Sequence, residues 1–268
     1  HYAAILTGEV ALRVLLLLGV MLTGAALGRY ELACVGATGV LIIFLVFSRR
    51  ARVAVASRAD RGYRPMLRTY LLAIVSTGST ALLVTGYGAI VKGIGHGNDP
   101  LVVGGLILAV SLTRAPIMMP LTAFTGVAIK VFLAHRDAPM RAIAKPSAAL
   151  FGLGIVGGAL AWLVGPWFVR LFNPGYLLPG WVFAVLTFSS ALMAVLTLLG
   201  TLVLALDAHV IYAAGWLLAS AVAIGILLLP ASLTVRVVTS LGVGPVVGSL
   251  TMLGWLVWKA RQNAAQSA

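Results

Sequence analysis

Eight runs of apolar residues, each close to the length of a membrane-crossing helix, divide this chain. A helix needs about 20 apolar residues to cross a hydrocarbon core of roughly 30 Å. The predicted spans cover residues 10–27, 32–47, 70–94, 101–134, 147–172, 181–206, 210–229 and 233–258. The pattern therefore predicts an all-α fold, a polytopic transmembrane helical bundle of about eight spans.

The composition supports a membrane protein and excludes several other classes. Only 9% of the 268 residues are charged and 61% are hydrophobic, whereas a soluble domain carries about 25% charged residues. The single cysteine, Cys34, excludes a disulfide framework and a multi-cysteine metal site. The four histidines are scattered without the spacing of metal ligands. We expect no metal and no cofactor.

Basic residues are concentrated in three segments, which predicts the orientation of the chain. The segments hold Arg49, Arg50, Arg52, Arg58, Arg61, Arg64 and Arg68, then Lys130, Arg136, Arg141 and Lys145, and finally Lys259 and Arg261. Arg and Lys are enriched in cytoplasmic loops, so both ends of the chain are predicted to be cytoplasmic. The net charge of +13 is explained by these loops, and no nucleic-acid partner is expected. Arg13 and Arg236, near span ends, are interpreted as snorkelling to the interface.

Arg114 is the most informative residue, because it lies well inside the fourth apolar run. A charge at membrane depth is expensive and normally faces protein or a water-filled cavity. One interpretation is an anion contact, since a guanidinium suits phosphate oxygens. The other is a structural pairing with backbone carbonyls that Pro116 and Pro120 release within the same helix.

A small polar cluster lies near the middle of the third predicted span. It consists of Ser76, Thr77, Gly78, Ser79 and Thr80. Such residues line a hydrophilic cavity or hydrogen-bond a neighbouring helix, and packing between membrane helices commonly uses them. A GxxxG spacing, Gly154 and Gly158, predicts close helix packing in the fifth span.

Several short motifs resemble one lobe of the polysaccharide flippases, in the multidrug/oligosaccharidyl-lipid/polysaccharide exporter superfamily. They are the segment 112–117 (LTRAPI), the basic turn 135–139 (HRDAP) and the segment 165–176 (GPWFVRLFNPGY). By this resemblance, residues 70–258 form a six-helix C-terminal lobe and residues 1–47 are the last two helices of the preceding lobe. Residues 48–69 are then a basic cytoplasmic linker between the lobes, and residues 259–268 a cytoplasmic tail.

The resemblance implies a transporter of the bacterial cytoplasmic (inner) membrane that serves cell-envelope polysaccharide synthesis. Its substrate would be a polyprenyl-phosphate-linked glycan, flipped to the outer leaflet by alternating access while its tail stays among the membrane lipids. Arg114 would contact the phosphate, and Thr113, Ser76, Thr77, Ser79 and Thr80 are weaker substrate-binding candidates. Family members have about twelve to fourteen helices, so the missing lobe is expected in an absent segment or on a second chain.

Three other functions compete with the flippase. A drug/cation antiporter of the same superfamily would need a buried carboxylate, and no acidic residue lies inside a predicted span. A non-catalytic membrane partner or scaffold of an envelope glycosyltransferase would suit a bundle with one buried arginine. An integral-membrane glycosyltransferase would require acidic residues at a membrane face, for which Asp99 is the one candidate. No catalytic constellation is recognisable, so we expect that the protein is not an enzyme.

Overall fold

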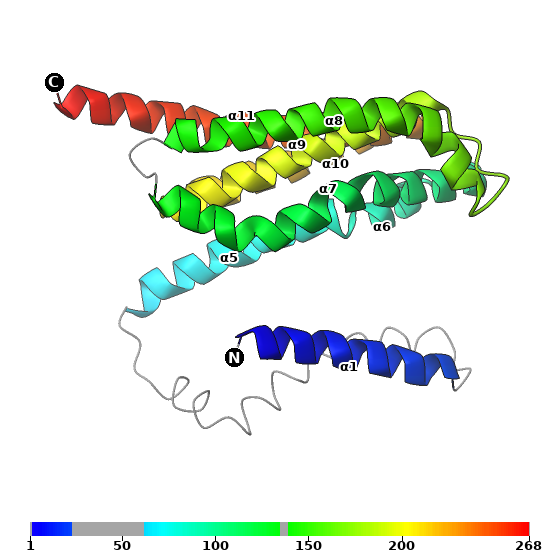
Figure 1. The fold of residues 1–268 in the computed structure, drawn as a ribbon, viewed down its shortest axis with the longest axis horizontal. Coiled ribbons are helices and arrows are strands. Elements are labelled where there is room, and N and C mark those ends of the chain that lie inside the picture. Colours follow the sequence, from blue (N-terminus) through cyan, green and yellow to red (C-terminus); the bar gives the residue numbers. More distant parts are fainter. Residues whose placement is uncertain (1, 23–61, 135–138, 268) are drawn as a thin grey trace. The chain divides into compact units, whose positions relative to one another are not determined.

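The computed structural model describes residues 2–22, 62–134 and 139–267, and these form helices joined by short turns, with no strand among them. The helices are α1 (Tyr2–Leu22), α5 (Tyr63–Val84), α6 (Tyr87–Ile94), α7 (Pro100–Ala134), α8 (Pro139–Arg170), α9 (Gly180–Ala205), α10 (His209–Leu227) and α11 (Leu233–Ser267) (Figure 1). The chain divides into two units, His1–Tyr63 and Arg64–Ala268. The all-α prediction is confirmed.

Within the described residues, five helices are long and apolar enough to cross a membrane, and a bent pair makes a sixth span if counted as one. The five belong to α7–α11, and the bent pair is α5 with α6. A polytopic bundle is therefore confirmed. Helix α1 contains most of the predicted first span, whereas the predicted second span and most of the basic segment 48–69 lie outside the described residues. The total of eight spans stays a prediction.

Three helices extend beyond their predicted ends. Helix α8 begins at Pro139 rather than at residue 147, because proline fits the first turn of a helix and good helix formers follow it. Helix α11 continues to Ser267, since the predicted tail is rich in Ala, Gln, Lys and Arg, which favour helix. Helix α5 starts at Tyr63, inside the predicted linker. The described parts of these segments, residues 63–69, 139–145 and 259–267, are therefore helical extensions of the spans.

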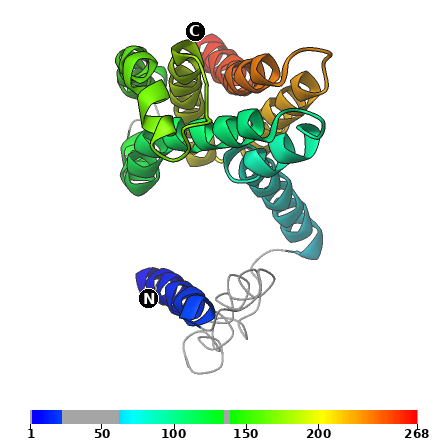
Figure 2. The ribbon, with the colours of Figure 1, turned by 90° about the vertical axis from the view of Figure 1, so that its right-hand side faces the viewer.

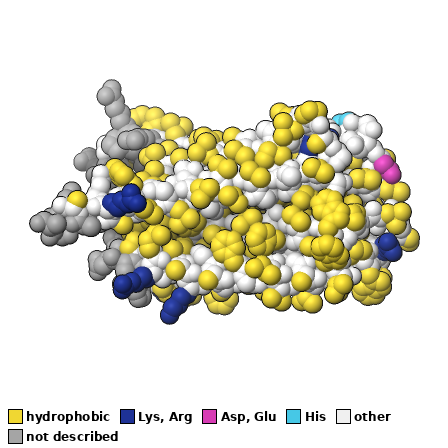
Figure 3. All heavy atoms as spheres, turned by 90° about the horizontal axis from the view of Figure 1, so that it is seen from above, with side chains coloured by type: hydrophobic (Ala, Val, Ile, Leu, Met, Phe, Trp, Pro, Cys, Tyr) yellow, Lys and Arg dark blue, Asp and Glu magenta, His cyan; other side chains and the backbone are white. Residues whose placement is uncertain are grey.

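Helix α9 occupies the centre of the second unit and contacts α7, α8, α10 and α11. Figure 2 shows α8–α11 grouped side by side. Of the most apolar stretch of α9, 72% is buried within the protein, against 11% for α8. The two helices are similarly apolar, so α8 is interpreted as facing lipid. Hydrophobic side chains cover most of the face in Figure 3, with Lys and Arg atoms near its ends.

Glycines allow the closest helix contacts. A methyl group at Gly154 would lie 2.6 Å from the Cβ atom of Ala191, and one at Gly158 would lie 3.1 Å from the Ala184 carbonyl oxygen. The GxxxG spacing therefore packs α8 against α9, as predicted. A second contact was not predicted: a methyl group at Gly248 on α11 would lie 2.7 Å from the backbone oxygen of Gly215 on α10.

Candidate functional site

The third predicted span is broken, and the candidate site lies at this break. Helices α5 and α6 meet at an angle of 62°, with Thr85 and Gly86 between them. The backbone N–H groups of Thr85 and Gly86 both donate to the Ala81 carbonyl, each at 2.8 Å. A helix end leaves its last carbonyl groups without intrahelical donors. The break therefore presents unpaired carbonyl oxygens of α5 within the bundle.

Arg114 binds two of these carbonyl groups. Its Nη1 atom donates to the Leu83 oxygen at 2.7 Å and to the Val84 oxygen at 2.8 Å. Arg114 lies 14 residues after Pro100, about 21 Å along α7 at 1.5 Å per residue. A cation at a helix C-terminus is also favoured by the helix dipole. Arg114 therefore caps α5 at membrane depth.

This geometry corrects the interpretation as a structural pairing within α7, whereas the anion contact stays a prediction. The carbonyl groups that pair with Arg114 come from the break in α5, and not from the prolines of its own helix. Arg114 keeps 8% of its surface exposed, and both hydrogen bonds use the same nitrogen. Its Nε atom is buried without a hydrogen-bond partner. The guanidinium thus has donor capacity beyond the capping contact.

A second polar contact lies one turn further along the broken span. The Tyr87 hydroxyl on α6 hydrogen-bonds the Ser240 side chain and reaches the Val237 carbonyl oxygen at 3.2 Å, both on α11. Tyr87 is 1% exposed and Ser240 is fully buried. The two contacts hold α6 and the end of α5 between α7 and α11. No periodicity in the sequence singles out Tyr87 or Ser240, so neither was predicted.

The predicted polar cluster is divided between faces of α5. Ser76 is buried, and its hydroxyl bonds to the Leu72 and Ala73 carbonyl groups of its own helix. Ser79 is buried as well, and its carbonyl oxygen accepts a 3.0 Å hydrogen bond from the Ser220 hydroxyl of α10. Thr77 is exposed. The contact of Ser220 with Ser79 supports the interpretation of this cluster as helix packing.

The remaining two threonine candidates also bond within their own helices. The Thr80 hydroxyl donates to the Ser76 carbonyl oxygen at 2.9 Å, and Tyr212 of α10 interacts with the same side chain. The Thr113 hydroxyl is buried and donates to the Ala109 oxygen at 2.8 Å. Thr113 lies next to Arg114 in sequence, and its hydroxyl is occupied by α7. The structure thus places Arg114 at the break, with Tyr87 as its unpredicted neighbour.

Arg236 makes a contact of the same kind elsewhere in the bundle. Its Nη1 atom donates to the carbonyl oxygen of Leu227, the last residue of α10, at 3.0 Å. Its Nε atom is buried without a partner. The snorkelling interpretation stays a prediction, and the nearby helix end supplies an acceptor that it did not include. Arg236 is therefore a natural control for Arg114.

Acidic and metal-binding groups do not contribute to this region in the part of the chain that the structure describes. No group of three His, Cys, Asp or Glu side chains could hold a metal ion there. Asp99 accepts a 2.9 Å hydrogen bond from the Leu101 backbone N–H. This contact is typical of a residue that caps a helix start, here that of α7.

The chain is similar to several mycobacterial proteins of uncharacterised function. It is 33% identical over 251 residues to Rv1510 of Mycobacterium tuberculosis, covering 92% of this chain and 57% of that protein. It is 34% identical over 250 residues to Rv3630 of the same species and to Mb3654 of Mycobacterium bovis. Each of these matches covers 92% of this chain and 58% of the relative. The chain thus spans somewhat more than half the length of these curated relatives. No family model and no solved structure matches it.

Proposed function

We propose that this chain is part of a membrane transporter that flips a polyprenyl-phosphate-linked sugar from the cytoplasmic to the outer leaflet of a bacterial inner membrane. Arg114 is the observation that carries the proposal. Among the described residues whose exposure is known, it alone is a buried charged side chain. Intramembrane charges commonly mark substrate pathways. In this mechanism Arg114 holds the lipid phosphate, and the polyprenyl chain stays in the bilayer.

The broken span supports a moving part next to Arg114. Transporters place substrate sites near the bilayer midplane, at discontinuous helices. Here the break between α5 and α6 is held on one side by Arg114 and on the other by Tyr87 and Ser240. A phosphate that binds the Arg114 guanidinium competes with the Leu83 and Val84 carbonyl groups. Substrate arrival would thereby loosen α5 from α7 and couple binding to movement of the span.

The distribution of charge supports the proposed orientation. Lys130, Arg141, Lys145, Lys259 and Arg261 lie where α7 ends, α8 begins and α11 ends. The opposite end of the bundle carries fewer basic residues, namely Lys92, Arg170 and Arg236, with Asp99. By the positive-inside rule, the first end faces the cytoplasm. The phosphate-linked sugar would enter from this side.

Two of the competing functions find less support in the structure. Asp99 is engaged in capping α7, which weakens its candidacy as the acid of a glycosyltransferase. A drug/cation antiporter needs a buried carboxylate, and the described acids whose exposure is known, Asp99 and Asp207, are both exposed. A scaffold for an envelope glycosyltransferase remains the second candidate, because a structural cap needs no substrate. We propose a transporter rather than an enzyme.

Translocation by the full-length protein in proteoliposomes tests the proposal. The probe is a fluorescent polyprenyl-phosphate-linked sugar, and the measurement is its accessibility to a quencher on each side of the membrane. We expect wild-type protein to move the probe and Arg114→Gln, which keeps an amide donor but loses the charge, to move it at least about tenfold more slowly, as for a lost charged contact of about 1.5–3 kcal/mol.

Arg236→Gln is the matched control, since it alters a second arginine that caps a helix end. It should retain translocation at the wild-type rate. If Arg114→Gln inserts normally and translocates as fast as wild type, Arg114 is only a structural cap. If wild-type full-length protein moves no probe, the scaffold function takes precedence.

A further inference from the structure

An apolar crevice opens between α7, α8 and α9 in the second unit, away from the break. Its volume is about 410 Å³, and its walls are formed by residues 121–132 of α7, 142–153 of α8 and 197–201 of α9. Several of its rim residues are strongly exposed, with Phe124 at 64%, Val127 at 57% and Leu153 at 51%. Most of α8 is not covered by other parts of the protein, so the crevice opens toward the bilayer.

The lining offers no free hydrogen-bond donor to a polar ligand. Its hydroxyl groups belong to Thr125, Thr197 and Thr201. Each donates to a carbonyl oxygen of its own helix, at 3.0, 2.9 and 2.9 Å. The other lining residues are aliphatic, aromatic or proline side chains. The lining therefore favours a hydrocarbon ligand.

The volume suits one lipid chain segment. A methylene group is of similar size to a water molecule, whose share of liquid volume is about 30 Å³. The crevice thus holds on the order of a dozen methylene groups, most of one acyl chain. Within the bilayer, acyl chains are the hydrocarbon that is available to fill it.

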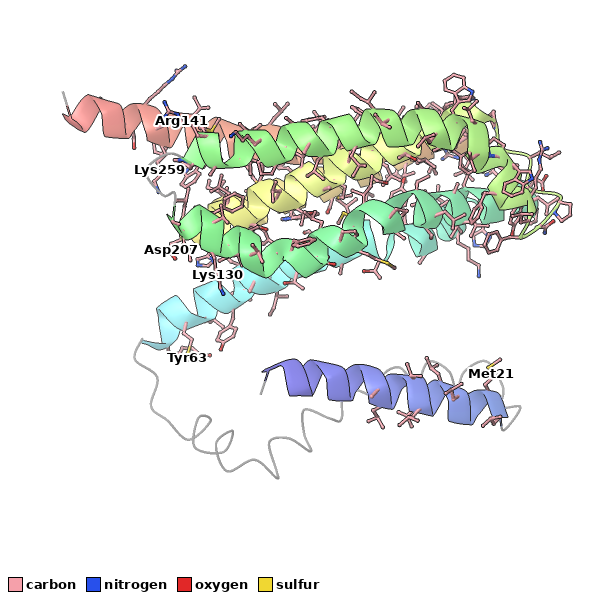
Figure 4. The ribbon with its side chains drawn as sticks, viewed as in Figure 1. Met21, Tyr63, Lys130, Arg141, Asp207 and Lys259 are labelled. Atoms are coloured by element: carbon pink, nitrogen blue, oxygen red, sulfur yellow. The ribbon has the colours of Figure 1, made fainter. Side chains whose placement is uncertain are left out.

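Three exposed basic residues are each followed in the sequence by a residue that lines the crevice. Lys130 precedes the lining residue Val131, Arg141 precedes Ala142, and Lys145 precedes Pro146. Figure 4 shows Lys130 and Arg141 at the same end of the bundle, where α7 ends and α8 begins. The acid labelled at this end is Asp207, in the turn after α9. A lipid in the crevice would place its headgroup among these cations.

We propose that this crevice binds one acyl chain of an anionic phospholipid, with the lipid phosphate held by Lys130, Arg141 and Lys145. The charges select the headgroup, and the crevice fixes the position of the chain. The site lies on the outer surface of α7, α8 and α9, and it does not depend on the proposed transport activity. Its function is to anchor the end of α7 and the start of α8 to the charged leaflet.

Native mass spectrometry of the full-length protein, titrated with phosphatidylglycerol or phosphatidylcholine, tests the site. Wild-type protein should prefer phosphatidylglycerol at least about tenfold, since each basic residue near an anionic surface contributes about fivefold. The combined variant K130Q/R141Q/K145Q should lose this preference. Ala149→Trp, which fills the crevice from α8, should weaken binding of phosphatidylglycerol at least about fivefold by removing packing contacts of the chain.

Ala144→Trp is the matched control. Ala144 is also an exposed alanine of α8, but it lines a different cavity, between α8, α9 and α11. It should bind phosphatidylglycerol as wild type does. The proposal is overturned if Ala149→Trp binds like wild type, if both tryptophan variants lose binding equally, or if the triple variant keeps the preference. Circular dichroism of each variant establishes that the helices are intact.

Discussion

Arg114 on α7 and Leu83 at the end of α5 are joined by a hydrogen bond of 2.7 Å, between the guanidinium Nη1 and the backbone carbonyl oxygen. Val84 accepts a second bond from the same nitrogen. One side chain thus satisfies two carbonyl groups that a broken helix leaves open inside an apolar bundle. Breaking this contact should affect stability and, by the proposed mechanism, transport.

Replacement of Arg114 by methionine should destabilise the protein by about 1–3 kcal/mol, because one buried and one partly buried carbonyl group lose their donor. Arg114→Lys should recover part of the loss, since an ammonium group also donates to carbonyl oxygens. The measurement is the thermal unfolding midpoint in detergent. Arg236→Met removes a single such bond and should cost less. Equal midpoints for Arg114→Met and wild type would show that the cap contributes nothing.

Tyr87 and Ser240 should be energetically coupled through their hydrogen bond. We expect Tyr87→Phe to destabilise more than Ser240→Ala, because it removes both contacts between α6 and α11, whereas Ser240→Ala leaves the Tyr87 hydroxyl its bond to the Val237 carbonyl oxygen. A double-mutant cycle should give a coupling energy of about 0.6–1.7 kcal/mol, as for other hydrogen bonds between membrane helices. Reversible unfolding in mixed micelles provides the four free energies. Additive effects of the two substitutions would contradict the contact.

Gly248→Ala should separate α10 from α11. Its methyl group would lie 2.7 Å from the Gly215 backbone oxygen. A backbone atom cannot rotate away as a side chain can, so the two helices would have to move apart. The expected loss is about 1–3 kcal/mol, typical of overpacking. Gly254→Ala, on the same helix, is the control because nothing lies within 4 Å of the added methyl group. Its unfolding midpoint in detergent should stay unchanged or rise slightly.

The turn between α9 and α10 depends on Asp207, which has a φ angle of 61°. Its N–H bonds to the Leu204 oxygen at 3.0 Å, and the Ala208 N–H bonds to the Val203 oxygen at 3.1 Å. This pattern is a Schellman motif, whose left-handed position favours glycine or asparagine. Asp207→Val should cost about 1–2 kcal/mol. Asp207→Asn, which tolerates the same backbone angle, should unfold at nearly the wild-type temperature.

The sequence alone determined the fold class and the apolar helices of the second unit. Long apolar runs can satisfy their backbone groups within a membrane only as helices or closed barrels, so α7, α9 and α10 follow almost directly from the residues. The rarity of buried charge likewise identified Arg114. Helix ends were less predictable where polar but helix-favouring residues follow a span, as in α8 and α11.

Only the tertiary structure decided what each span faces and which partners the polar groups find. Helices α8 and α9 are both apolar, yet one is largely exposed and the other is central, because lipid-facing and protein-facing residues share the same hydrophobicity in a membrane. The bend of 62° between α5 and α6 is not encoded by a proline. Arg114 meets Leu83 across 31 residues, and Tyr87 meets Ser240 across 153. Such pairings arise from helix packing, which local sequence patterns do not specify.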